Sequence, residues 1–346
     1  MPHLLHIGMP NTFTRNIQDM FAHDEDNFFL GIGDGLKVPR QVAYALETEL
    51  MQVPGHHYND TVVAQVFDAA FLTAQEQDCG SVIISDDRIT DGFTLGGVSY
   101  AERLARLEAV MPDDTTVLMV VRNPVDYLKA QYKHLIMTRA LPIGYRDFVK
   151  YLLVRGSKSY LGLLDYASLV GAARAHFNDI EVVLYEQIAQ DDEAIHKLLA
   201  SKGIITHAPF FKKDLAAVSD SEAACFQKLA SEQSGTASGH PVLQLDAGDV
   251  DTFVENSPAF EDLLLRDAVG KAAIENITEG AKKLAAARPD IRVDYELDMQ
   301  TEKMLNGYLM QVNRKLAEVT GLPLSHYGYD LGEELEEADG AVTAAE

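Results

Sequence analysis

Residues 3–18 read His-Leu-Leu-His-Ile-Gly-Met-Pro-Asn-Thr-Phe-Thr-Arg-Asn-Ile-Gln, and this stretch decides the fold. Its apolar part, Leu4 to Met9, predicts a short buried strand, and Pro10 predicts a tight turn. A helix is expected to begin near Thr12 or Thr14. A strand, a tight loop and a helix N-terminus together form a generic phosphate site, because free N–H groups and the positive end of the helix dipole converge there, and the threonine hydroxyls add donors. The alternative is an ordinary strand-to-helix turn capped by a threonine.

Further apolar runs predict the other strands of a sheet. They lie at residues 27–33, 81–85, 115–121 and 180–185, with segments of helical spacing between them, one of which predicts a helix over 161–177. Short continuous apolar strands that alternate with helices are typical of a parallel sheet covered on both faces. The chain therefore predicts an α/β protein, a three-layer α/β/α fold with a mostly parallel central sheet.

The C-terminal part has a different character. From about residue 209 the pattern is helical, with helices expected at 259–286 and 301–319 and only a weak strand signal at 291–297. Residues 332–346 are acidic and rich in alanine, which predicts a disordered tail. We expect a single α/β domain over residues 1–331, with a helical C-terminal portion.

Composition excludes several classes of function. The 346 residues carry 29 basic and 53 acidic side chains, a net charge of −24, so nucleic acid and anionic membranes are not expected as partners. Two cysteines, Cys79 and Cys225, give neither a disulfide framework nor a cysteine metal site, so no metal is expected and a reducing, cytoplasmic location fits best. The N-terminus lacks a signal-peptide pattern, and no apolar run reaches the length of a membrane span.

A second strand-to-helix junction carries a permanent cation. The run Thr115 to Val121, the most apolar in the chain, leads directly into Arg122-Asn-Pro124. In an open α/β sheet, ligands bind at the carboxyl ends of the strands, near the switch in strand order. Because an unpaired buried guanidinium is costly, Arg122 is expected to bind an anion there. The alternative is a structural salt bridge.

At these residues the chain resembles the sulfotransferases, and in particular their bacterial branch. The resemblance covers roughly residues 3 to 331 and rests on the order and spacing of several short motifs rather than on any one of them. These are Pro10-x-Thr-x-Thr14, Arg122-Asn-Pro124 with Gln131-Tyr132 in the following helix, Glu186 after the last strand, and the segment from Asn313-Arg-Lys-Leu-Ala to Gly321-Leu-Pro-Leu-Ser-His-Tyr-Gly-Tyr329.

The resemblance implies a P-loop-type fold and the transfer of a sulfuryl group from 3′-phosphoadenosine 5′-phosphosulfate (PAPS) to a hydroxyl or amine of a small-molecule or glycan acceptor. It implies that Arg122 binds the 3′-phosphate. It also implies that one continuous loop cradles the 5′-phosphosulfate, formed by Pro10, Asn11, Thr12, Phe13, Thr14 and Arg15. Preorganised donors and cations would stabilise the charge on the transferred group, much as they do in phosphoryl transfer.

The loop departs from the family pattern Pro-Lys-(Thr/Ser)-Gly-Thr-Thr. Asn11 replaces the lysine, Phe13 the glycine and Arg15 the last threonine, while Ala130 stands where the family has a serine for the 3′-phosphate. Losing one transition-state donor typically costs about 10²–10³ in rate. Arg15, or Lys37 from elsewhere, is a candidate for the missing cation.

Three residues are candidates for the base that deprotonates an acceptor. Asp87 follows the end of the strand at 81–85, and His56 and His57 lie in a polar loop; a histidine is the natural base near neutral pH. The alternatives are a turn aspartate and two solvated loop histidines. The basic pair Lys212-Lys213 is a further candidate phosphate contact or a surface feature.

Two hypotheses follow. The first is a PAPS-dependent sulfotransferase with a remodelled loop, and the second is a catalytically silent relative that binds a nucleotide or a partner. A P-loop nucleotide kinase is disfavoured because no Gly-Lys-Ser/Thr follows a glycine-rich loop.

Overall fold

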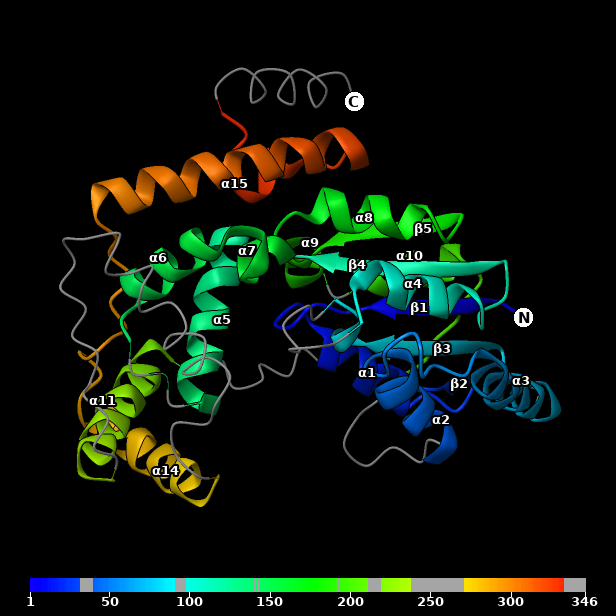
Figure 1. The fold of residues 1–346 in the computed structure, drawn as a ribbon, viewed down its shortest axis with the longest axis horizontal. Helices are drawn as coiled ribbons and strands as arrows, with labels where there is room; N and C mark the ends of the chain where they lie inside the picture. Colours follow the sequence, from blue (N-terminus) through cyan, green and yellow to red (C-terminus); the bar gives the residue numbers. More distant parts are fainter. Residues whose placement is uncertain are drawn as a thin grey trace. The chain divides into compact units, whose positions relative to one another are not determined.

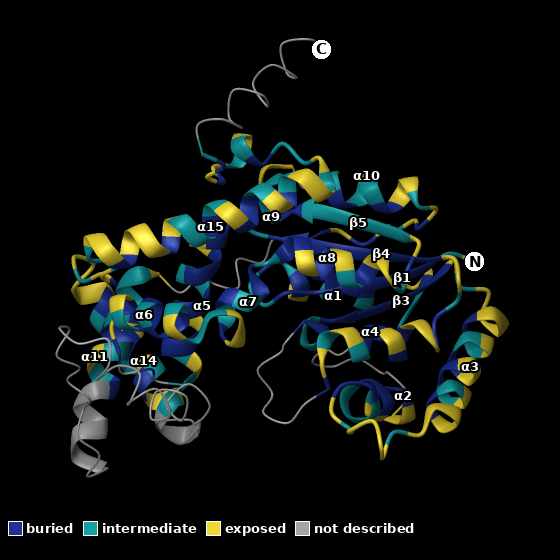
Figure 2. Ribbon diagram, turned by 45° about the horizontal axis from the view of Figure 1, so that its top comes forward, coloured by how far each residue is buried: buried dark blue, intermediate teal, exposed yellow. Residues whose placement is uncertain are grey.

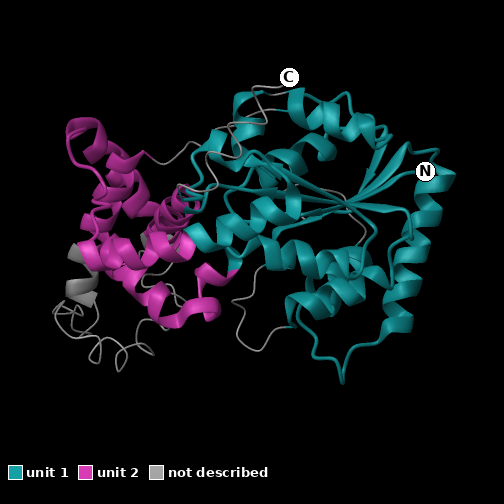
Figure 3. Cartoon of the chain, turned by 90° about the horizontal axis from the view of Figure 1, so that it is seen from above, with its two compact units in different colours: residues 1–124, 163–213, 310–346 teal, residues 125–162, 214–309 magenta. Residues whose placement is uncertain are grey.

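The computed structural model describes residues 1–31, 40–90, 98–139, 141, 143–191, 193–210, 219–237 and 271–332, with the backbone alone at 231–237 and 271–273. The chain forms two compact units (Figure 3): unit 1 comprises residues 1–124, 163–213 and 310–346, and unit 2 comprises residues 125–162 and 214–309. The predicted single domain stays a prediction. Lys37, Lys212, Lys213 and the tail beyond Gly332 lie outside the described residues.

Among the described residues of unit 1, the strands form one parallel sheet in the order β2-β3-β1-β4-β5 (Figure 1). Every residue of β1, β3 and β4 is buried, which explains why continuous apolar runs form these strands. β4 matches its predicted run residue for residue. The bounds are β1 His3–Ile7, β2 Asn27–Phe29, β3 Ser81–Asp86, β4 Thr115–Val121 and β5 Asp179–Leu184.

Helices cover both faces of the sheet. On one face, α1, α9 and α10 share a hydrophobic core with side chains of β1, β3 and β4. On the other face, α3 contacts β1 through a ring contact between Phe71 and His3, α8 packs on β5, and α4 packs on α8. The bounds are α1 Thr14–Ala22, α3 Asp60–Glu76, α4 Tyr100–Glu108, α8 Tyr166–Arg174, α9 Tyr185–Gln190 and α10 Glu193–Ser201.

The remaining elements complete the two units. The short elements of unit 1 are α2 Arg40–Tyr44, the π-helix η1 Ala45–Leu50, the 3-10 turn η2 Asp87–Ile89 and the 3-10 turn η4 Leu324–Tyr327. The other elements lie in unit 2 or run between the units: α5 Pro124–Arg139, α6 Tyr145–Arg155, η3 Gly156–Lys158, α7 Tyr160–Leu163, α11 Asp220–Ala237, α14 Lys271–Ala287 and α15 Met299–Thr320.

The burial pattern locates the core of unit 1 at the centre of the sheet (Figure 2). β1, β3 and β4 are buried along their whole length, whereas the edge strand β5 is half-buried at all but its last residue. The predicted three-layer α/β/α class is therefore confirmed. No helix among the described residues is long and apolar enough to cross a membrane.

Two sequence-based expectations were wrong in detail. The pattern over residues 161–177 predicts one helix, but the chain forms α7 and α8 separately. The side chain of Asp165 accepts a hydrogen bond from the N–H of Ser168, and this N-cap starts a new helix. The weak strand signal at 291–297 is also wrong, because these residues have no regular structure and Val293 is buried from an irregular segment.

Candidate anion-binding site at the carboxyl edge of the sheet

The predicted loop and Arg122 follow two neighbouring strands. β1 and β4 pair from His3↔Thr115 to Ile7↔Met119, and the same offset places Arg122 level with Pro10, beyond the paired residues. The chain leaves β1 towards β2 on one side of the sheet and leaves β4 towards β5 on the other side. This divergence is the switch point at which open α/β sheets bind ligands.

The loop after β1 has an unusual backbone. Asn11 and Phe13 both adopt the left-handed conformation, with φ of 62° at each, and Phe13 is the N-cap of α1. Left-handed residues alternating along a turn direct successive N–H groups to one side and form an anion-binding nest. Among the described residues, residues 10–13 form a turn that starts at Met9, and no short, well-aligned hydrogen bond from the N–H groups of Thr12, Phe13 or Thr14 is found. The loop therefore offers amides that an anion can use.

The two threonine hydroxyls are used within the loop. Thr12 Oγ1 donates to the carbonyl of Met9 at 2.7 Å, and Thr14 Oγ1 donates to the same carbonyl at 2.9 Å. Both side chains are buried. The donors that this arrangement presents are therefore the backbone amides, and the hydroxyls serve to fix the turn.

Arg122 is half-buried and only partly satisfied. Its Nη1 donates to the carbonyl of Asn11 at 3.0 Å, which ties the end of β4 to the loop, while its Nε is buried without a hydrogen-bond partner. The hydroxyl of Tyr166 donates to the backbone carbonyl of Arg122 at 2.9 Å and fixes its main chain. A buried guanidinium N–H without an acceptor can bind an anionic ligand. Among the described residues, no carboxylate lies within ion-pair distance of Arg122, although the Arg122 charge acts on the pKa of Glu186.

Phe13 takes part in an aromatic contact beside the loop. Its ring stacks on that of Tyr185, with 4.2 Å between centroids and an interplanar angle of 15°, and it meets Phe210 edge-on at 5.7 Å. The guanidinium carbon of Arg122 lies 4.3 Å from the centroid of the same Tyr185 ring. The loop after β1, the end of β4 and the start of α9 thus meet at the Tyr185 ring.

Glu186, the next residue of α9, supports the end of β4. Its Oε1 accepts the N–H of Asn123 at 2.8 Å, and its Oε2 accepts the hydroxyl of Tyr329 at 3.2 Å. Asn123 Nδ2 donates in turn to the carbonyl of Gly328 at 2.9 Å. Burial raises the pKa of Glu186, although these hydrogen bonds and the Arg122 charge oppose the shift.

Of the candidate bases, Asp87 lies beside the loop. Its Cα is 3.2 Å from the point where a Cβ on Gly8 would lie, and Thr90 of the same turn donates to the carbonyl of Gly8 at 2.9 Å. The preceding Asp86 is buried and paired with Arg88 through two hydrogen bonds of 3.0 and 2.9 Å. Burial raises the pKa of Asp86 to about 6 against the pull of Arg88, so it is mostly ionised at neutral pH.

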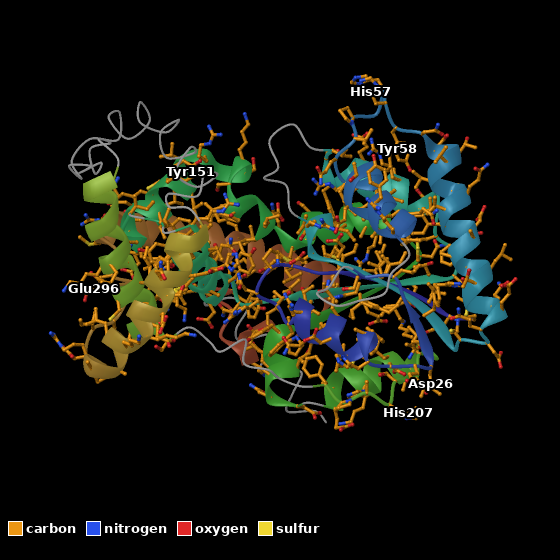
Figure 4. All side chains as sticks on the ribbon, turned by 90° about the horizontal axis from the view of Figure 1, so that it is seen from below. Asp26, His57, Tyr58, Tyr151, His207 and Glu296 are labelled. Atoms are coloured by element: carbon orange, nitrogen blue, oxygen red, sulfur yellow. The ribbon has the colours of Figure 1, made fainter. Side chains whose placement is uncertain are left out.

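The two histidines lie on the surface. His56 and His57 are exposed and contact each other, with ring centroids 4.1 Å apart. Figure 4 shows His57 at the outer margin of the ribbon. No contact between either ring and residues 8–14 or Arg122 is found in the described part of the chain. Arg15 is exposed in the first turn of α1. The structure thus brings Asp87 to the loop, while both histidines remain predictions without a contact to it.

Sequence reasoning gave the tyrosines around Arg122 no role in the site. Tyr166, Tyr185 and Tyr329 come from α8, α9 and the segment after η4, and each contacts Arg122 or Glu186. Tyr185 was expected to be the last residue of a strand, and its place at that carboxyl end is the one signal that pointed to this edge of the sheet. Among the described residues, no group of three or more His, Cys, Asp or Glu side chains is placed to hold a metal ion.

Comparison with known proteins gives little further information. No protein-family model and no curated protein matches the sequence. Among solved structures, the chain is similar to a sulfotransferase from Alicyclobacillus acidocaldarius, with 16% identity, a TM-score of 0.42, and an alignment covering 67% of this chain and 94% of that one. At this level of similarity, no residue role is transferred to this chain from that protein.

Proposed function

We propose that the chain is a sulfotransferase that uses PAPS as its donor and a hydroxyl or amine of a small-molecule or glycan as its acceptor. One observation carries the proposal: the amide nest at residues 12–14 and the buried, unpartnered Nε of Arg122 follow adjacent strands at the switch point of the sheet. Backbone amides at one place and a guanidinium at the other suit a ligand with two anionic groups. The motif order that resembles the sulfotransferases supports the same assignment.

The residues present fit such a donor. The amides of Thr12, Phe13 and Thr14 would hold the 5′-phosphosulfate, and Arg122 would hold the 3′-phosphate. PAPS supplies an activated sulfuryl group at this site. The amides contribute by neutralising negative charge on the transferred group, and Asp87, whose Cα lies near Gly8 at the start of the loop, is the proposed base for the acceptor's proton.

A second candidate function is nucleotide binding without transfer. The loop carries Asn11 where the family has its lysine, and both threonine hydroxyls donate to Met9 instead of facing outward. The ring of Phe13 is stacked on Tyr185 beside Arg122. These observations leave the amides and one guanidinium for binding but no lysine in the loop for the departing oxygen, which favours a silent binder.

Release of 3′-phosphoadenosine 5′-phosphate (PAP) from PAPS separates the two functions. The wild-type chain, Arg122→Ala and the control Arg174→Ala, an exposed arginine of α8, are incubated with PAPS and a panel of hydroxyl, amine and glycan acceptors. A sulfotransferase gives acceptor-dependent release in wild type and Arg174→Ala, and at PAPS concentrations below saturation a release about 10–10²-fold lower in Arg122→Ala, because the 3′-phosphate loses its cation. PAP binding without any release would favour the silent binder, and neither binding nor release would reject both.

A further inference from the structure

Three segments of unit 1 meet on the ring of Tyr185, the first residue of α9. The Phe13 ring stacks on it at 4.2 Å, and the Arg122 guanidinium carbon lies 4.3 Å from its centroid. Phe13 belongs to the nest loop, Arg122 follows β4, and Tyr185 follows β5 directly. Both contacts are made by the aromatic ring of Tyr185.

The Arg122 side chain would be poorly fixed without this ring. One hydrogen bond, from Nη1 to the carbonyl of Asn11 at 3.0 Å, ties it to the loop. A single bond leaves a guanidinium free to rotate about that contact, whereas stacking over an aromatic face fixes its plane. With both contacts in place, the buried Nε keeps a definite direction and remains available as a donor.

We propose that Tyr185 is a positioning residue of the anion site. It holds the Arg122 guanidinium and the Phe13 loop in one arrangement, so that the cation and the amides of residues 12–14 serve the same ligand. This role rests on the proposed function in one respect, that a nucleotide with a 3′-phosphate binds here. Tyr185 acts through Arg122 and Phe13.

The competing explanation is plain packing. Tyr185 and Phe13 both pack against the hydrophobic core under α1 and α9, so losing the ring would also lower stability. Packing and positioning differ in what they do to ligand discrimination. A loss of packing lowers the melting temperature and leaves the preference for a 3′-phosphate intact, whereas a misplaced Arg122 reduces that preference.

The test uses Tyr185→Leu and Tyr185→Phe, with Tyr44→Leu as a control at an exposed tyrosine of α2. Leucine keeps apolar volume but removes the aromatic face, and phenylalanine keeps the face. Calorimetric titration with PAP and with adenosine 5′-phosphate gives the 3′-phosphate preference as a ratio of affinities, and a melting curve without ligand reports stability. We expect that ratio to fall about tenfold in Tyr185→Leu and to stay within about twofold of wild type in Tyr185→Phe and Tyr44→Leu.

A double-mutant cycle adds a second readout. If Tyr185 acts through Arg122, Tyr185→Leu changes PAP affinity little in an Arg122→Ala background. The role is overturned if Tyr185→Leu keeps the wild-type affinity ratio, whatever its melting temperature, or if its effect is fully additive with Arg122→Ala. Failure of the wild-type chain to bind PAP is a different result, because it removes the proposed function together with this role.

Discussion

The backbone N–H of Asn123 donates to Glu186 Oε1 at 2.8 Å, so the residue after Arg122 is fixed by the first turn of α9. Together with the Tyr329 hydroxyl at 3.2 Å from Oε2, this bond places one half-buried carboxylate at the end of β4. Asn123 and Tyr329 are themselves buried, at 8% and 2% exposure, so their donor groups have little access to water.

Glu186→Ala is therefore expected to destabilise the protein. Each buried donor left without an acceptor lowers the free energy of unfolding by roughly 1–3 kcal/mol. The substitution leaves two such donors, the Asn123 N–H and the Tyr329 hydroxyl. Glu186→Gln keeps a side-chain carbonyl and should cost less. Urea unfolding curves of both variants measure the difference. A Glu186→Ala midpoint equal to that of wild type would show that the carboxylate does not support this edge of the sheet.

Gly8→Ala is expected to disrupt the loop after β1. A Cβ at Gly8 would lie 2.5 Å from Thr14 Cγ2 and 2.6 Å from Thr14 Oγ1, and Thr14 is held by its bond to Met9. Such overpacking costs roughly 1–3 kcal/mol. Gly171→Ala in α8 is the matched control: nothing lies within 4 Å of its added Cβ, and a gain of about 0.4–1 kcal/mol is expected. Equal melting temperatures for the two variants would contradict this.

Stability should fall on acidification because of His6. Its Nδ1 lies 2.7 Å from Ser85 Oγ, its Nε2 is buried without a partner, and burial lowers its pKa from 6.5 to about 3. The unfolded chain binds a proton at His6 below pH 6.5 and the folded chain does not until about pH 3, so His6 costs stability as pH drops through this window.

The loss should reach roughly 2 kcal/mol between about pH 7 and pH 5. His6→Asn keeps a polar partner for Ser85 without titrating, so its unfolding free energy should depend less steeply on pH. Asp86, whose raised pKa gives a slope of the opposite sign, is common to both proteins and cancels in the comparison. Parallel pH profiles for wild type and His6→Asn would contradict the buried neutral histidine.

Asp165→Ala should destabilise α8 by about 1 kcal/mol. The Asp165 side chain accepts the Ser168 N–H at 3.3 Å and the Ser168 hydroxyl at 2.8 Å, which is the N-cap of this helix. Asp165→Asn retains a capping oxygen and should be nearly neutral. Thermal melts compare the two variants, and an equal loss in both would mean that charge, not capping, matters at this position.

The sequence specified the sheet better than the site. The β4 run was predictable to the residue because two β-branched threonines followed by five successive apolar side chains suit a strand covered on both faces. The position of Arg122 at the edge of the sheet was predictable too, because it directly follows the end of β4. The stack of Phe13 on Tyr185 did not, because it joins segments far apart in the chain, and no local pattern encodes which two rings meet.

The helix break at Asp165 and the direction of the threonine hydroxyls show a second limit of local patterns. Residues 161–177 have helical spacing throughout, and only the cap formed by Asp165 reveals two helices. Thr12 and Thr14 were expected to present donors outward, but the left-handed Asn11 and Phe13 turn the chain so that both hydroxyls reach Met9. The local backbone conformation therefore decided both where α8 begins and where the two threonine hydroxyls point.

The most direct test of the central claim is a calorimetric titration of the wild-type chain and Arg122→Ala with PAP, with adenosine 5′-phosphate as the ligand lacking the 3′-phosphate. The account predicts saturable binding of PAP by the wild-type chain, accompanied by a rise in melting temperature, since ligand at about a hundredfold its Kd adds about 2.7 kcal/mol to stability. It predicts that Arg122→Ala binds PAP no better than adenosine 5′-phosphate. Equal binding of PAP by wild type and Arg122→Ala, or no binding by the wild-type chain at millimolar ligand, would contradict the account.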